Sequence, residues 1–279
     1  MKLAVLSGKG GTGKTFVSVN LAAAAGSAIY IDCDVEEPNG RIFLRPENLI
    51  SKTINIKQPV FDSEKCTGCR KCVAFCRFNA LVYVKTKPML FSEVCHSCGG
   101  CRLVCPSGAV SETEKPVGNV ECGKSGDIRV VTGCMDLGEA SGIPVIRAAL
   151  AEAPDTDDLT VIDCPPGSAC SVMESIQAAD YCLLVAEPTA FGLHNFKMVY
   201  ELVSLLHKPC GAVINKAGGK YTELDDFCCE HGVPVLLRIP YSEKLARLGA
   251  SGQIAALSDS EYAEMFRSLL GDIRREAHV

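Results

Sequence analysis

One stretch of the sequence decides the fold of this chain: Gly8-Lys9-Gly10-Gly11-Thr12-Gly13-Lys14-Thr15. It comes after a short apolar run from Lys2 to Leu6 and precedes an alanine-rich run from Phe16 to Ala25, which predict a strand and a helix. The stretch satisfies G-x-x-x-x-G-K-[ST], in which the backbone N–H groups of a glycine-rich loop turn toward phosphates. Lys14 is then expected to contact the β- and γ-phosphates of a nucleoside triphosphate, and the Thr15 hydroxyl to ligate Mg²⁺.

The rest of the chain alternates strand-like and helix-like segments on both sides of a cysteine-rich stretch. The predicted strands are Ile29–Ile31, Ile128–Val131, Leu159–Ile162, Tyr181–Ala186, Gly211–Ile214 and Val235–Ile239, and the predicted helices are Val145–Glu152, Phe196–Leu206 and Thr222–His231. Apolar strands that alternate with helices favour an α/β fold of the P-loop NTPase class, with a mostly parallel sheet and helices on both faces. We expect one P-loop domain made of residues 1–60 and 115–279, interrupted by an inserted α+β module at residues 61–114.

The chain contains 17 cysteines, and two runs of them share one spacing. The runs are Cys66-x2-Cys69-x2-Cys72-x3-Cys76 and Cys95-x2-Cys98-x2-Cys101-x3-Cys105-Pro106. This spacing is typical of bacterial ferredoxins, in which three thiolates wrap one cluster and the fourth reaches the other cluster. It predicts a ferredoxin-like module with two [4Fe-4S] clusters, one held by Cys66, Cys69, Cys72 and Cys105, the other by Cys76, Cys95, Cys98 and Cys101. Zinc is the alternative, since C-x2-C pairs also form tetrahedral zinc sites. The first run also departs from the pattern, because Arg77 stands where a proline often comes after the fourth cysteine.

Composition excludes several classes of function. The chain has 279 residues, of which 47% are hydrophobic, and a formal net charge of -5. This acidic balance argues against a nucleic-acid partner, whose binding usually requires a basic surface. The apolar stretch from Leu21 to Ile31 is too short to span a bilayer, and the first strand lacks the features of a signal peptide. We expect a cytoplasmic protein, in which reduced thiols bind metal instead of forming disulfides.

A second lysine near the start of the phosphate loop, Lys9, gives the loop the form K-G-G-T-G-K-T. In this it resembles the deviant Walker A loop of the MinD/ParA/nitrogenase-iron-protein class. The resemblance implies an ATPase in which Lys9 reaches across a dimer interface and stabilises the transferring phosphate of the partner. It leaves open whether the dimer pairs like chains or this chain with a related one.

Three further segments match that class. Asp34, in Asp32-Cys33-Asp34, lies where the first switch is expected, and by resemblance it positions the attacking water. Asp163 comes after an apolar strand in Asp163-Cys164-Pro165-Pro166-Gly167 and is expected to hold Mg²⁺ through water. Asn215 begins an N-K-x-D-like element in which Gly218 replaces the guanine-reading Asp. ATP is therefore favoured over GTP, with Asn215 expected to bind the adenine edge. The expected catalytic residues are Lys9, Lys14, Asp34 and Asp163.

Two features outside these motifs leave alternatives open. Cys170 lies after Asp163 at the spacing of the cysteine that shares a cluster across the dimer of the nitrogenase iron protein, with Cys134 or Cys122 as its second ligand. The alternative is a structural cysteine. A helical apolar stripe near the C-terminus is expected to pack on the sheet, with MinD-like membrane contact as its alternative; it comprises Met265, Phe266, Leu269, Leu270 and Ile273.

Across the whole chain the sequence resembles a MinD-superfamily P-loop ATPase with an inserted ferredoxin domain. Three functions are compatible with this resemblance. The first is an ATPase that couples nucleotide state to electron transfer to, or docking on, a partner protein. The second is an accessory factor in iron–sulfur or metal-cofactor assembly, and the third is a redox-sensing positioning ATPase. The expected partners are a second ATPase chain and a redox or metal-cofactor client.

Overall fold

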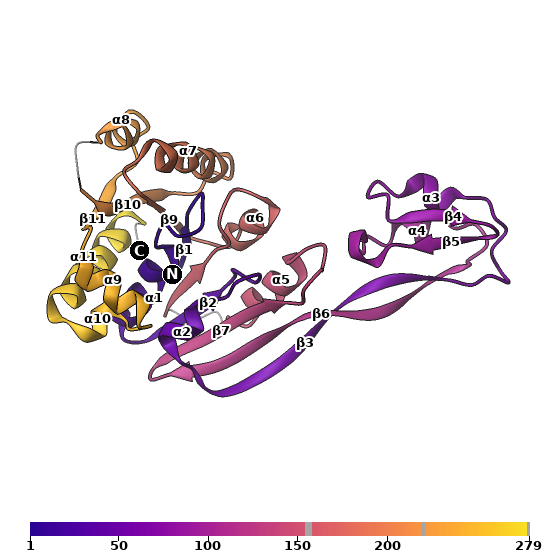
Figure 1. Ribbon diagram of the computed structural model, residues 1–279, viewed down its shortest axis with the longest axis horizontal. Coiled ribbons are helices and arrows are strands. Elements are labelled where there is room, and N and C mark those ends of the chain that lie inside the picture. The colour runs from indigo at the N-terminus through magenta and orange to yellow at the C-terminus, as the bar shows by residue number, and fades with distance from the viewer. Residues whose placement is uncertain (154–157, 219–220, 278–279) are drawn as a thin grey trace.

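The computed structural model describes residues 1–153, 158–218 and 221–277. Its centre is a nine-stranded sheet with the order β11-β10-β9-β1-β8-β2-β7-β6-β3 (Figure 1). The strands are β1 (Lys2–Leu6), β2 (Ala28–Asp32), β3 (Glu47–Phe61), β6 (Val110–Ser125), β7 (Ile128–Met135), β8 (Leu159–Asp163), β9 (Tyr181–Ala186), β10 (Cys210–Ala217) and β11 (Val235–Pro240). Neighbouring strands run parallel from β11 to β7, whereas β6 pairs antiparallel with both β7 and β3. The predicted α/β fold with a mostly parallel sheet is therefore confirmed.

Helices cover both faces of the parallel part of the sheet. One face carries α5 (Ile143–Ala151), α6 (Cys170–Ile176), α7 (Ala190–Leu205) and α8 (Glu223–Glu230). The other face carries α1 (Lys14–Ala25), α2 (Gly40–Leu44), α9 (Glu243–Ala250), α10 (Ala255–Ser258) and α11 (Ser260–Glu276). Because both faces are covered, all residues of β2, β8 and β9 are buried.

The C-terminal helix α11 packs on this second face, as its apolar stripe predicts. Phe266, Leu269, Leu270 and Ile273 are buried, and the Phe266 ring lies edge-on to Phe16 of α1 with 5.9 Å between ring centroids. The stripe has the i, i+3, i+4, i+7 spacing of a helix with one core-facing side. Among the described residues, no helix combines the length and the hydropathy that crossing a membrane requires.

The carboxyl ends of the central strands bring the predicted motifs together. In the register of the sheet, Asp163 at the end of β8 is the partner of Val5 on one side and of Asp32 on the other. The glycine-rich loop continues from β1, the Asp34 segment from β2, and the segment 164–167 from β8. Because these strands are parallel neighbours, all three loops lie at one edge of the sheet, where ligands bind in open α/β folds.

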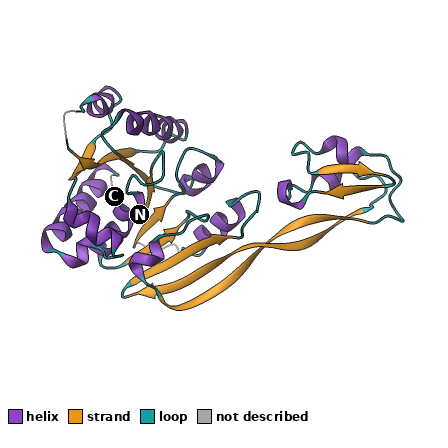
Figure 2. Cartoon of the chain, viewed as in Figure 1, coloured by secondary structure: helices purple, strands orange, loops and turns teal. Residues whose placement is uncertain are grey.

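A long antiparallel ribbon extends from the far end of the sheet (Figure 2). Strands β3 and β6 pair from Glu47 with Lys124 to Phe61 with Val110. No strand is predicted from the sequence over Glu47–Phe61. The reason is physical: most of this strand is exposed, so its residues lack the alternation that a half-buried strand shows.

The ribbon carries both cysteine runs at its tip, away from the parallel sheet (Figure 1). The elements there are α3 (Lys71–Phe75), β4 (Leu81–Val84), β5 (Lys87–Leu90), the 3₁₀ turn η1 (Ser92–Val94) and α4 (Gly100–Leu103). Left-handed backbone recurs at corresponding places of the two runs, in the pairs Gly68 and Ser97, Arg70 and Gly99, Asn79 and Gly108. The two runs therefore trace one backbone path twice. The division of the chain into domains at 61 and 114 remains a prediction.

The packing of α11 generates a stability prediction. Phe266 is 0% exposed, so Phe266→Ala removes a ring from the core and leaves a cavity, with an expected loss of about 3–5 kcal/mol in the free energy of unfolding. Urea unfolding monitored by circular dichroism measures this loss. Leu257→Ala, on neighbouring α10 and 70% exposed, is the control and should change stability by less than about 0.5 kcal/mol. Equal losses for the two variants would contradict the packing described for α11.

Candidate functional site

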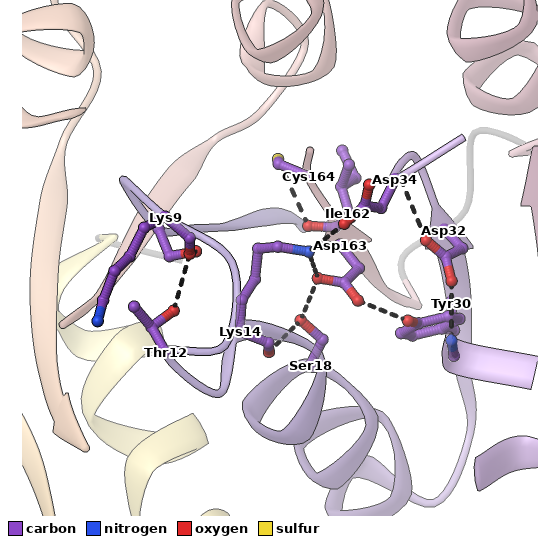
Figure 3. Close-up of polar contacts among 12 residues, drawn as sticks. Lys9, Thr12, Lys14, Ser18, Tyr30, Asp32, Asp34, Ile162, Asp163 and Cys164 are labelled. Atoms are coloured by element: carbon purple, nitrogen blue, oxygen red, sulfur yellow. Dashed lines mark hydrogen bonds and ion pairs between the residues drawn. The ribbon is translucent and has the colours of Figure 1, made fainter. Parts of the chain in front are cut away.

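Lys14 lies at the centre of the site, between two carboxylates (Figure 3). Its Nζ is 2.7 Å from Asp163 Oδ1 and 3.6 Å from Asp34 Oδ2, and its side chain is 6% exposed. Burial by itself lowers the pKa of Lys14, but the Asp163 and Asp34 carboxylates outweigh burial and hold the pKa above its usual value. Lys14 therefore remains a cation, and the three predicted residues meet at one point.

Two further side chains fix the orientation of Asp163. The Ser18 hydroxyl of α1 donates to Asp163 Oδ1 over 3.1 Å, and the Tyr30 hydroxyl of β2 donates to Oδ2 over 2.8 Å. Burial and then the neighbouring Asp163 raise the pKa of Tyr30 well above its usual value, so Tyr30 remains a donor. The sequence motifs do not include Ser18 and Tyr30, because each lies inside a helix or strand and neither belongs to a loop.

Asp32 organises the segment that holds Asp34. Its Oδ1 accepts the backbone N–H of Asp34 over 3.1 Å, and its Oδ2 accepts the N–H of Gly40 at the start of α2 over 2.9 Å. Burial and the nearby Asp163 raise the pKa of Asp32 above its usual range. The sequence motif contains both carboxylates, but only the structure distinguishes them: Asp32 is fully buried and holds the backbone, whereas Asp34 faces Lys14.

Lys9 is held within its own chain. Its Nζ donates to Glu187 Oε2 over 3.0 Å, and the ammonium lies 5.2 Å from the centroid of the Phe191 ring. Figure 3 shows the Lys9 side chain pointing away from Lys14. Lys216 donates to the other Glu187 oxygen over 2.5 Å and to the Gly11 carbonyl over 3.1 Å. Glu187 therefore binds both lysines, and the sequence motifs do not include it.

Asn215 ties β10 to the glycine-rich loop. Its Nδ2 donates to the Thr12 carbonyl over 2.7 Å, and the residue is 7% exposed. Gly13 packs so closely against it that a Cβ added there would lie 2.1 Å from Asn215 Nδ2. The adenine contact expected of Asn215 remains a prediction, but the residue stands beside the loop as that prediction requires.

A large cavity, with a volume of about 1130 Å³, opens in front of these groups. Lys9, Gly10, Gly11, Gly13, Lys14, Thr15 and Asp34 line it. Asp163 lies behind Lys14 with its side chain 0% exposed. The loop, the predicted Mg²⁺ residue Thr15 and the predicted water-positioning Asp34 therefore share one space that can accept a triphosphate.

The two cysteine runs come together at the tip of the ribbon. A small cavity of about 30 Å³ has four cysteines in its lining, which are Cys76, Cys95, Cys98 and Cys101. In the other predicted set, burial raises the pKa of Cys72, and the nearby Cys105 and Cys66 raise it further. Cys76 thus lies beside the second run and Cys105 beside the first, whereas the binding of clusters by these two sets remains a prediction. Within the described ranges, no group of three or more His, Cys, Asp or Glu side chains is arranged to hold a single metal ion.

Cys170 and its two candidate partners, Cys122 and Cys134, do not meet within one chain. Cys170 begins α6, is exposed and lines the large cavity. Cys122, on β6, lies beside Arg129 and Glu152, and Cys134, on β7, lies near Arg41 and Glu121. Among the residues that the structure describes, neither joins Cys170 in that cavity.

Comparisons with known proteins agree with this geometry. Residues 3–255 match the family described as CbiA: CobQ/CobB/MinD/ParA nucleotide binding domain. The uncharacterised protein MJ0579 of Methanocaldococcus jannaschii is 26% identical over 91% of this chain and 90% of its own length. The uncharacterised protein MJ0578 of the same organism is also 26% identical, over 96% of this chain and 95% of its own length.

Solved structures show the same fold. The cell division ATPase MinD of Pyrococcus furiosus gives a TM-score of 0.60 at 18% identity, over 98% of both chains. The septum site-determining protein MinD of Pyrococcus horikoshii, complexed with Mg-ADP, gives 0.58 at 17% identity, over 99% of this chain and 96% of that one.

The contact between Gly13 and Asn215 generates a prediction about the loop. Gly13 has φ +97, so Gly13→Ala adds both a clash with Asn215 and backbone strain of about 1–3 kcal/mol. The affinity for ATP, measured by calorimetry, should fall roughly tenfold or more. The control is Gly271→Ala on α11, outside the cavity, where an added Cβ also meets nothing within 4 Å. Unchanged affinity in Gly13→Ala would show that the loop does not bind the nucleotide in the conformation described.

Proposed function

Because the chain belongs to the CobQ/CobB/MinD/ParA nucleotide-binding family and is a P-loop ATPase of the MinD/ParA type, we propose that it couples ATP binding and hydrolysis to electron transfer to, or docking on, a partner protein. The observation that carries this proposal is the placement of Lys14 between Asp163 and Asp34 in a cavity lined by the glycine-rich loop. This placement brings three groups together: Lys14 as a cation for phosphate, Asp163 as a carboxylate for Mg²⁺, and Asp34 as a carboxylate for the attacking water. A cytoplasmic location is part of the proposal, since reduced thiols are needed at the cysteine runs.

ATP binding, in this proposal, exchanges the partners of Lys14. Backbone N–H groups of the loop and the start of α1 receive the phosphates, and Lys14 turns from the carboxylates to the β- and γ-phosphates. Thr15 and Asp163 would hold Mg²⁺, which supplies charge neutralisation for the phosphates. Ser18 and Tyr30 already fix both Asp163 oxygens, so this carboxylate is oriented before the ligand arrives.

Hydrolysis then depends on Asp34 and Lys9. Asp32 anchors the backbone of Asp34, so the released Asp34 carboxylate stays near the terminal phosphate, where it can orient water. Lys9 would leave Glu187 and reach the nucleotide of a second chain, which couples hydrolysis to dimer formation. The dimer and the role of Lys9 are supported by the resemblance of the loop to that of MinD/ParA ATPases.

The proposed role of Asp34 gives a direct test of the ATPase. Asp34→Asn should keep ATP affinity within a few-fold and lower kcat on the order of 10²-fold or more, because the water loses its carboxylate while the phosphate contacts remain. Single-turnover hydrolysis and nucleotide titration measure the two quantities. Asp127→Asn, the same change at an exposed aspartate outside the large cavity, is the control. An Asp34→Asn variant that hydrolyses ATP at the normal rate would rule out this role.

The ribbon tip is the second half of the proposal: a ferredoxin-like domain with two [4Fe-4S] clusters. Two observations support it. The cysteines approach one another in the two crossed sets that the spacing predicts, and both runs share one repeated backbone path. Cys66, Cys69, Cys72 and Cys105 would hold one cluster, and Cys76, Cys95, Cys98 and Cys101 the other. When bound, such clusters supply one-electron redox chemistry.

Metal analysis distinguishes this proposal from zinc binding. Protein purified without oxygen should contain about eight iron atoms per chain, and Cys98→Ser should reduce this to about four, because one ligand set is broken. Cys98 is exposed, so the substitution does not disturb the core. Cys229→Ser, an exposed cysteine on α8, is the matched control and should leave iron unchanged. Stoichiometric zinc in place of iron would overturn the cluster assignment and leave the ATPase proposal standing.

A further inference from the structure

The nucleotide cavity and the cysteine cavity have one wall in common. The large cavity contains the phosphate loop and Asp34, and the smaller one contains Cys76, Cys95, Cys98 and Cys101. Two residues line both cavities, Phe78 and His96. These two side chains lie on the boundary of both cavities, and we call them the partition.

The partition is a stacked pair of rings. The Phe78 and His96 ring centroids are 3.9 Å apart and the ring planes differ by 18°. One ring comes from each cysteine run: Phe78 stands two residues after Cys76, and His96 stands directly after Cys95. Both neighbouring cysteines belong to the same predicted ligand set. A displacement of the stack would therefore reach that set through the backbone on two sides.

The residues that correspond to Phe78 and His96 beside the other cysteine set do not reach the large cavity. In the repeated backbone of the two runs, Thr67 corresponds to His96 and Ser107 corresponds to Phe78. Among the described residues, neither Thr67 nor Ser107 lines the large cavity. The difference between the two cysteine sets arises from the sequence, because Phe78 and His96 are aromatic whereas the corresponding Ser107 and Thr67 are small and polar.

The large cavity is also lined by the segment that carries Asp34, which responds to nucleotide in the proposed mechanism. Asp34 to Glu37 and Asn39 line this space, as do residues 140–143 at the start of α5. The segment after β2 carries Asp34, whose ion pair with Lys14 must break when a phosphate binds. Ordering or release of such segments is how phosphate occupancy is communicated in P-loop proteins.

We propose that the Phe78–His96 stack couples the nucleotide site to the cysteine site formed by Cys76, Cys95, Cys98 and Cys101, so that this set senses the nucleotide while the set of Cys66, Cys69, Cys72 and Cys105 does not. This inference rests on the proposed function and adds the contact through which it operates. Coupling of binding is reciprocal. Metal loading of the second set therefore changes nucleotide affinity by the same factor by which nucleotide changes metal binding.

The chain has no tryptophan, which allows a site-specific reporter. Phe78→Trp introduces a single fluorophore into the partition, and Phe91→Trp introduces one on the same module outside both cavities. Phe78 and Phe91 are 43% and 44% exposed, so the two variants are matched in residue type, module and exposure. Each full-length variant, purified without oxygen, is titrated with Mg-ADP and separately with a non-hydrolysable ATP analogue, while calorimetry measures nucleotide affinity.

The coupling predicts a saturable change in emission from Phe78→Trp, with a midpoint equal to the calorimetric Kd, and no change from Phe91→Trp. Emission that does not change in Phe78→Trp while calorimetry shows binding overturns the coupling and leaves the ATPase intact. The same conclusion holds if both variants change alike. Absence of nucleotide binding in the unsubstituted protein overturns the proposed function itself, and the coupling with it.

Reciprocity gives a second, independent measurement. The Kd for Mg-ADP is compared between iron-loaded and iron-depleted protein, with circular dichroism to confirm that both are folded. The ratio of the two Kd values should differ from one by roughly fivefold or more. It should approach one in Phe78→Ala and persist in Phe91→Ala. A ratio that persists in Phe78→Ala overturns the role of the stack.

Discussion

A buried cation between two carboxylates is the constraint on which this structure depends. Lys14 is 6% exposed and its partner Asp163 is 0% exposed, so neither charge is tolerable alone. Their pairing joins the start of α1 to the end of β8, and Asp34 adds the segment after β2. Since these elements are neighbours in the sheet, one ion-pair cluster holds the whole ligand-binding edge. In the proposed mechanism, phosphate replaces the carboxylates as the partner of Lys14, and Mg²⁺ replaces Lys14 as the partner of Asp163. Until a ligand arrives, the ion pairs of Lys14 preserve the shape of the site.

The neighbouring groups have the same character: each is engaged within the chain and each can be released. Glu187 holds Lys9 and Lys216, and Asn215 holds the loop through Thr12. Asp32 and Tyr30 differ, because their hydrogen bonds lie behind the site and do not compete with a ligand. The site therefore consists of a back layer of buried hydrogen bonds and a front layer of ion pairs.

The sequence predicts the parts of this protein that carry short-range signals. The P-loop, the alternating segments, the buried stripe of α11 and the two cysteine runs each have a local pattern, and the sheet and the meeting of Lys14 with Asp163 and Asp34 result from them. The roles of Glu187, Tyr30 and Ser18 cannot be predicted in this way, because their partners are far away in sequence. Strands β3 and β6 escape prediction for another reason: a ribbon exposed over much of its length has no apolar face to give it a periodic pattern.

That ribbon has a topological consequence. Phe61 and Val110 are register partners at its end, so the chain leaves for the distal segment and returns from it at adjacent points. The ribbon already holds the two ends of the distal segment together. The entropy lost when a loop is closed between such ends increases only slowly with the length of the loop. A short turn between the two strands could in principle take its place without moving a residue of the parallel sheet. The cysteine-bearing tip is thus a segment that evolution can exchange beyond one pair of residues while the nucleotide-binding domain keeps its structure.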